Sequence, residues 1–146
     1  MKPIVCALRG GPGSHFTRRH ALEQTAATGA ALYLLVVIPA SAYNPLHEGE
    51  QRSIRAEMAW RELALARANA AQLGLPDIQF NIQIRIGVLQ ATIAEFVESV
   101  DAGTVLLGAP RDAHDAHMSA ASIDSLAAEL RSGLGVAVEI VHPPAR

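Results

Sequence analysis

The sequence predicts an α/β protein with a doubly wound, five-stranded parallel sheet flanked by four helices. Apolar runs of strand length alternate with longer amphipathic segments along the chain. Each connection between predicted strands is long enough for a right-handed crossover. Residues 32–38 (LYLLVVI) are apolar on both faces, as in a central parallel strand covered on both sides. Over 146 residues there is no linker or internal repeat, so a single domain spanning residues 1–146 is expected.

The chain opens with a predicted strand and helix. Residues 4–8 (IVCAL) form an apolar run typical of a buried strand, and the breaker cluster RGGPG follows it. Ser14 is expected to cap a helix over residues 15–28, which Gly29 ends.

The second predicted strand is residues 32–38, which Pro39 ends. A loop then leads to a long helix over residues 50–73, whose apolar residues recur at helical spacing. Gly74 and Pro76 terminate this helix.

Several polar residues of these two helices are expected at the surface. Arg18 is assigned to the exposed face of the first helix, and Glu62 to the polar face of the long helix. Met58 and Trp60, on the long helix, are expected either to pack internally or to form a subunit contact.

The second half of the chain contains the remaining strands. Residues 78–86 alternate strictly between apolar and polar side chains, which predicts a strand with one wet face at a sheet edge. An amphipathic helix follows from Leu89. The last predicted strand (VAVEIV) begins at Val136 and ends at Val141.

Composition excludes several classes of protein. A net charge of −2 without charge blocks argues against nucleic acid or an anionic membrane as the main partner. The single cysteine, Cys6, excludes an internal disulfide framework and is expected to be buried. No apolar stretch is long enough to span a membrane or to act as a secretory signal, so a cytoplasmic location is expected.

Residues 104–127 carry the layout that α/β proteins use to hold phosphate. An apolar strand ends at Gly108, a polar loop follows, and Ser122 is expected to cap the next helix. The glycine-rich loop that contains Gly10 and Gly11, ahead of the helix at Ser14, is a second candidate anion site.

Taken together, these segments resemble the universal stress protein family. The resemblance covers nearly the whole chain and depends on IVCALRGG at the first strand, GAALYLLVVIP at the second, and IRIGVLQATIAEFVESVDAGTVLLGAP from the third strand into the fourth. It implies an adenine nucleotide alpha hydrolase-like fold with the third strand at the sheet edge.

Nucleotide-binding members of that family carry a Gly, two residues, Gly, nine residues, Gly, Ser/Thr motif after the fourth strand. Aligned from Gly108, the second glycine falls on Arg111, the third on Ala121, and the Ser/Thr position on Ser122. The spacing is kept, but two of three glycines are missing, and glycines let backbone N–H groups approach phosphate.

Two other family positions bear on the ligand. The family's acidic residue after the first strand is replaced by Arg9, which removes an acceptor for ribose hydroxyls and supplies a cation. Val37 occupies the position whose backbone would meet the adenine edge. The candidate nucleotide-binding residues are therefore Arg9, Gly10, Gly11, Val37, Gly108, Arg111 and Ser122.

No catalytic constellation emerges from the sequence. The segment Asp112-Ala113-His114-Asp115-Ala116-His117 matches no metal-ligand signature and is interpreted as solvated loop. Ser14 beside His15 lacks a nucleophile elbow and is better explained as a helix cap. No catalytic residue and no metal ligand is therefore assigned, and an enzyme is the less favoured interpretation.

The resemblance implies a stress-response or signalling protein that is a non-catalytic homodimer, with weak or altered nucleotide binding. Family dimers form through the fifth strand, here the strand from Val136 to Val141, and a small anionic ligand is a candidate partner. One alternative is genuine ATP or AMP binding, with magnesium and slow hydrolysis. A second is a protein–protein adaptor that uses the long helix and its preceding loop.

Overall fold

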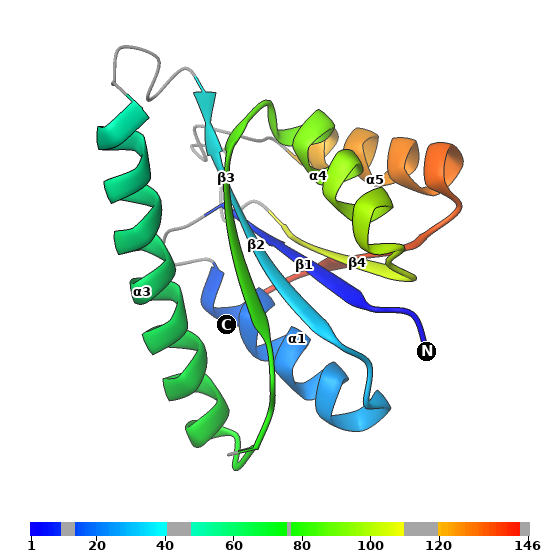
Figure 1. Ribbon diagram of the computed structural model, residues 1–146. Helices are drawn as coiled ribbons and strands as arrows, with labels where there is room; N and C mark the ends of the chain where they lie inside the picture. Colours follow the sequence, from blue (N-terminus) through cyan, green and yellow to red (C-terminus); the bar gives the residue numbers. More distant parts are fainter. Residues whose placement is uncertain (10–13, 41–47, 76, 110–119, 144–146) are drawn as a thin grey trace.

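The computed structural model is a parallel sheet with helices on both faces (Figure 1). It describes residues 1–9, 14–40, 48–75, 77–109 and 120–143. The strand order is β3-β2-β1-β4-β5. Every neighbouring pair is parallel, as the sequence predicts. The strands are β1 (Ile4–Leu8), β2 (Leu32–Pro39), β3 (Asn81–Gly87), β4 (Thr104–Gly108) and β5 (Ala137–Val141).

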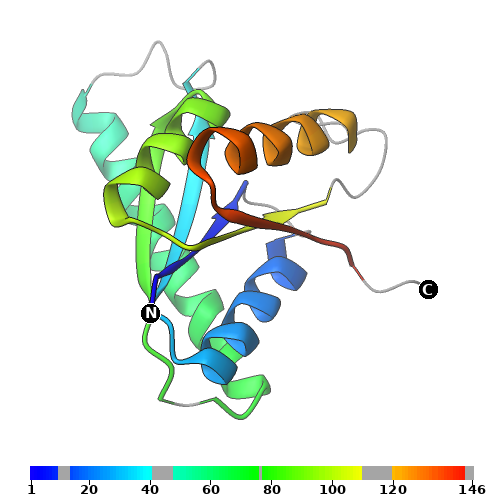
Figure 2. The same ribbon diagram turned by 90° about the vertical axis from the view of Figure 1, so that its right-hand side faces the viewer.

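Four helices cover the sheet in the described part of the chain: α1 (Ser14–Thr28), α3 (Glu48–Gln72), α4 (Leu89–Val100) and α5 (Ala120–Leu134). Helices α1 and α3 lie on one face, and α4 and α5 on the other (Figures 1 and 2). None of the described helices is both long and apolar enough to cross a membrane.

Each face of the sheet has its own apolar core. Successive side chains of a strand point to opposite faces, so Cys6 joins the core under α1 and α3, whereas Val5 joins the core under α4 and α5. Both residues are completely buried. Burial raises the pKa of the Cys6 thiol far above its ordinary value, and the thiol is buried as expected.

Two helices, α1 and α4, end at a residue with a left-handed backbone conformation. Gly29 has a φ of +77° and its N–H donates to the carbonyl of Thr25, so it terminates α1 as predicted. Asp101 takes the same left-handed conformation after α4, with a φ of 51°.

The third strand is shorter than its alternation predicts. Pairing with β2 starts at Asn81, opposite Tyr33, so the predicted start at residue 78 is wrong. The apolar residues Ile78 and Phe80 instead pack against the core beneath α3 without strand partners. Helix packing therefore produces the same alternation that a strand would.

Candidate functional site

The candidate site lies at the carboxyl ends of β1 and β4. These adjacent strands lead into connections that run to opposite sides of the sheet, and such a reversal of strand order is where open α/β sheets bind ligands. The register pairs Ala7 with Leu107, so Gly108 lies beside Leu8, and Arg9 follows one residue beyond.

Arg9 bridges the two strand ends. Its Nη2 donates a hydrogen bond of 3.1 Å to the carbonyl oxygen of Gly108. Two residues that the sequence marks separately are thus brought together across the point of reversal. The bridge places a guanidinium where the resemblance expects an acidic acceptor.

Gly108 is held against α1. A Cβ built on Gly108 would lie 2.6 Å from Oγ1 of Thr17, which is itself only 2% exposed. The absence of a side chain therefore lets α1 approach the end of β4 closely. This packing gives Gly108 a structural role that does not depend on phosphate.

Val37 and Ser122 differ in what they can offer a ligand. Val37 is 2% exposed and its side chain packs in the core under α4 and α5, so only its backbone is available. Ser122 is exposed, but α5 already begins at Ala120, so the expected role of Ser122 as N-cap is wrong. The alanines before Ser122 favour helix, which explains the earlier start of α5.

The remaining candidates lie outside the described residues. These are Gly10, Gly11 and Arg111, together with the Asp112–His117 segment weighed as a metal site. Within the described ranges, no group of three or more His, Cys, Asp or Glu residues could hold a metal ion. Magnesium would therefore find no carboxylate cluster in that part of the chain.

The structure does not support Ser14 and His15 as a nucleophile and its base, because the His15 imidazole already contacts Asn69. Ser14 is buried in the first turn of α1, and Nδ1 of His15 lies 3.3 Å from Nδ2 of Asn69 on α3. Burial lowers the pKa of His15, with further contributions from Arg19 and Arg18. A neutral ring accepting through Nδ1 satisfies both observations.

Arg18 and Glu62 are buried, which corrects their predicted exposure. The Arg18 guanidinium donates to both carboxylate oxygens of Glu62, at 2.8 and 2.9 Å, and to Oδ1 of Asn69 at 3.2 Å. Arg18 is 3% exposed and Glu62 6%. Helical periodicity could not reveal this pair, because the two residues are 44 positions apart and each resembles a surface residue alone.

Comparison with known proteins agrees with this architecture. The family model for the universal stress protein family matches residues 1–134. A search of curated proteins found no match.

Solved structures share the fold at low sequence identity. The universal stress protein UspA from Lactobacillus plantarum is 17% identical with a TM-score of 0.68, over 96% of this chain and 97% of that one. A universal stress protein from Archaeoglobus fulgidus in complex with dAMP is 15% identical with a TM-score of 0.63, over 97% and 98%. Another, in complex with cAMP, is 17% identical with a TM-score of 0.70, over 98% of each chain.

Proposed function

Because the chain belongs to the universal stress protein family, we propose that it is a cytoplasmic stress-response protein with altered nucleotide recognition. The ligand would bind at the carboxyl ends of β1 and β4 and present an anionic group to Arg9. The observation that carries the proposal is the hydrogen bond that the Arg9 guanidinium donates to the Gly108 carbonyl. Adenine nucleotides bound by the two structural neighbours support a nucleotide-like ligand.

In this proposal the protein binds its ligand without catalysing a reaction. Of the described side chains at the strand ends, Arg9 is a permanent cation and the Val37 side chain is in the core, so neither acts as a base or nucleophile. Weak adenosine recognition follows from the same substitution, because a guanidinium cannot accept hydrogen bonds from ribose hydroxyls.

A thermal-shift series with ATP, ADP and AMP, each with and without magnesium, tests this function. A ligand at ten times its Kd stabilises by about 1.4 kcal/mol, which raises the Tm of a chain this size by about 3–6 °C. We expect a shift of that size only at millimolar nucleotide for the natural chain. Arg9→Asp, which restores an acceptor, should lower the nucleotide concentration that is needed.

Arg9→Ala separates loss of the cation from gain of the acceptor, and Arg19→Asp, on α1, is a charge reversal for comparison. Tight ATP binding by the natural chain, with phosphate release in the presence of magnesium, would instead support the ATP-hydrolysing alternative. No shift with any nucleotide or with Arg9→Asp would remove the nucleotide proposal.

The homodimer expected through the strand from Val136 to Val141 stays a prediction. One backbone group that it would need is occupied, because Nη2 of Arg131 donates to the carbonyl of Val138 at 2.7 Å. A dimer through β5 therefore requires that the Arg131 side chain move away from this edge.

A further inference from the structure

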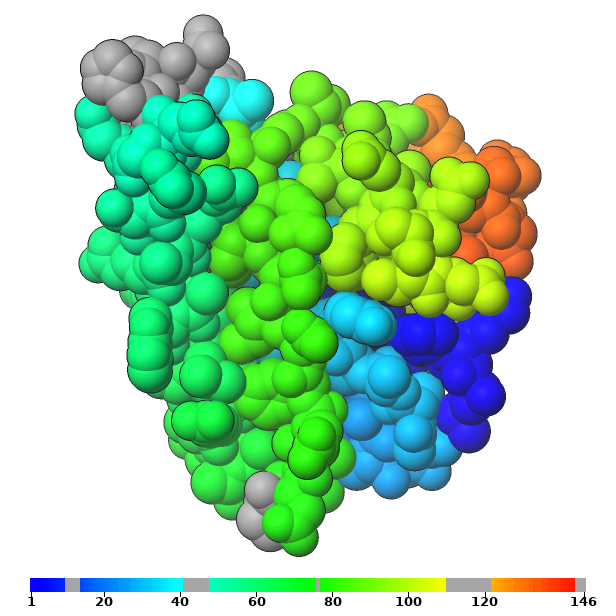
Figure 3. Space-filling model, in the orientation of Figure 1, coloured from blue at the N-terminus to red at the C-terminus, as the bar shows by residue number. Residues whose placement is uncertain are grey.

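The face formed by α3 and β3 carries an apolar surface that no described element covers. Trp60, the sole tryptophan of the chain, is 72% exposed on α3. It borders a shallow hollow of about 380 Å³ with Leu63 and Ile82. Figure 3 shows β3 open at the surface between α3 and α4.

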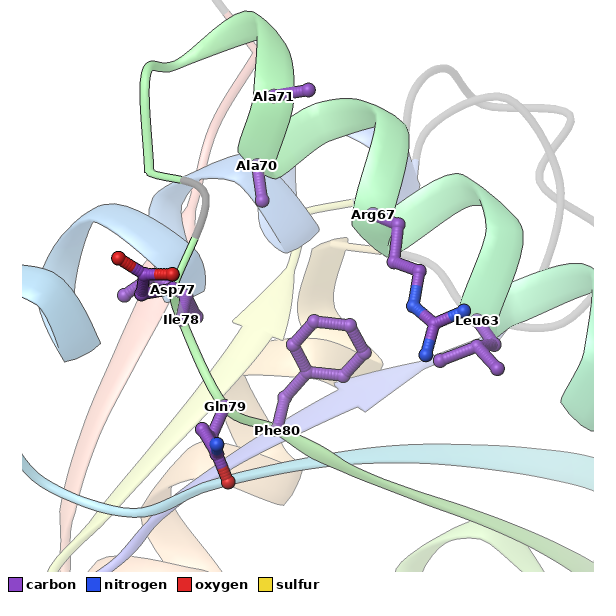
Figure 4. A pocket seen from close by; sticks show the side chains of 8 residues that line it. All are labelled: Leu63, Arg67, Ala70, Ala71, Asp77, Ile78, Gln79 and Phe80. Atoms are coloured by element: carbon purple, nitrogen blue, oxygen red, sulfur yellow. The ribbon is translucent and has the colours of Figure 1, made fainter.

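A larger groove continues from Leu63 toward the end of α3. Its volume is about 650 Å³, and Phe80 lies in it between the helix and the strand (Figure 4). Arg67 extends along the groove beside Leu63, and Ala70 and Ala71 form its helical wall (Figure 4). An aromatic projection thus lies on the same face as a groove that is part apolar and part polar, since Asp77 and Gln79 line it together with Arg67.

Their spacing is self-complementary. Trp60 precedes the groove residues Arg67 and Ala71 by 7 and 11 positions, or about 10–16 Å along a helix. A two-fold axis near Ala64, which is exposed and small, would place each Trp60 over the groove of the other copy. Arg67 would then face the partner's indole, a favourable cation–π arrangement.

Both sheet edges are less available to a second copy. At the β5 edge, the backbone N–H of Ala137 donates to the carbonyl of Gly103, and the N–H of Ala109 donates to the carbonyl of Val141. Because backbone groups alternate in direction along a strand, the N–H and C=O of Val138 point away from β4. The Val138 carbonyl accepts a hydrogen bond from Arg131.

The same alternation holds at the other edge. The backbone N–H of Ile4 donates to the carbonyl of Ala31, and this sets which residues of β2 pair with β3. By the register of β2 and β3, the backbone N–H and C=O of Ile84 then point away from the sheet. The Ile84 carbonyl accepts a hydrogen bond from Arg85 at 3.3 Å. Strand addition at either edge must displace an arginine, whereas the α3 face needs no such change.

We propose that the α3–β3 face is a self-association surface in which Trp60 of each copy enters the α3–β3 groove of the other. This symmetric contact is independent of the ligand site and of the predicted dimer through the last strand. It assigns the exposed tryptophan and the groove to one partner, a second copy of this chain.

Sedimentation velocity and tryptophan emission across low-micromolar to submillimolar concentrations test the proposal on the full chain. We expect dimers whose single tryptophan emits at shorter wavelength as concentration rises. Trp60→Ala, which removes the projection, and Ala71→Arg, which fills the groove, should each raise the dimer Kd roughly tenfold or more.

Leu65→Ala is the matched control, because Leu65 is an exposed apolar residue of α3 that is turned well away from the groove. Melting curves establish that both interface variants fold, as expected for exposed positions. A chain that stays monomeric throughout, or a dimer that both variants leave intact, would overturn the proposal. Nucleotide titration of the same variants reports separately on the ligand site.

Discussion

Arg18 joins α1 to α3 through charge. Its guanidinium has partners on two turns of α3, the Glu62 carboxylate and the Asn69 amide oxygen. Asn69 in turn contacts His15, so the network extends to the first turn of α1. Because each member satisfies another, the interior can hold an ion pair that neither side chain could tolerate alone.

Removing one charge of this pair should destabilise the fold strongly. Glu62→Gln leaves the Arg18 cation buried without its counter-charge, and we expect a loss of about 3–5 kcal/mol in the free energy of unfolding. Urea denaturation measures it. The matched control is Glu57→Gln, an exposed carboxylate of the same helix, expected to change stability by less than about 0.5 kcal/mol.

Replacing both partners with apolar residues, Arg18→Met with Glu62→Leu, should recover much of that loss. A loss below about 1 kcal/mol for Glu62→Gln would contradict the inferred role of the pair.

At the candidate site, the sequence predicts which residues follow the strand ends but not what they contact. Arg9 and Gly108 are identified from their positions at strand ends, but their hydrogen bond depends on the strand order and on one side-chain rotamer. Arg18 and Glu62 are missed for a similar reason, since a residue's burial depends on a partner distant in the chain.

Among the elements, α1 lies close to the end of β4 because residue 108 has no side chain. Thr17 on α1 occupies the space that a Cβ on Gly108 would take. Thr17 is buried and β-branched, so its side chain has little freedom to move aside. The approach of this helix to the strand end therefore requires glycine at position 108.

Gly108→Ala should destabilise the chain by about 1–3 kcal/mol through overpacking. Thermal and urea unfolding measure the change, and Gly133→Ala is the control, because a Cβ on that glycine meets nothing within 4 Å. Combining Gly108→Ala with Thr17→Ala should restore part of the stability by removing Oγ1. Strictly additive losses would show that the two positions do not compete for space.

Element boundaries show where sequence patterns are ambiguous. The helices α1 and α4 and the strands β1 and β4 follow from apolar runs and glycine stops, and they agree with the structure within one or two residues. The start of β3 does not, because Ile78 and Phe80 are partly buried beneath α3 rather than paired in the sheet. An alternation with period two therefore indicates which side chains are buried. Whether the segment is hydrogen-bonded into the sheet depends on where the neighbouring strand begins.

For the whole molecule, the parallel sheet separates two apolar cores that share the central strands. The residues Val5, Cys6 and Leu106 are completely buried on β1 and β4. In contrast, β3 has exposed residues at Asn81 and Arg85 and pairs on one side only. Loss of β3 would therefore expose less apolar surface than loss of either central strand.

Hydrogen exchange should resolve this hierarchy. We expect the amides of Cys6 and Leu106 to exchange only through global unfolding, with a free energy and urea dependence equal to those from equilibrium denaturation. The sheet-paired amides of Gln83 and Arg85, which face β2, should exchange through smaller openings with a lower free energy and weaker urea dependence. Equal free energies for β1 and β3 would show instead that the sheet opens as one unit. If Trp60 forms the proposed self-contact, protection of β3 should increase with protein concentration in the natural chain but not in Trp60→Ala, because the partner would cover the part of β3 beside α3.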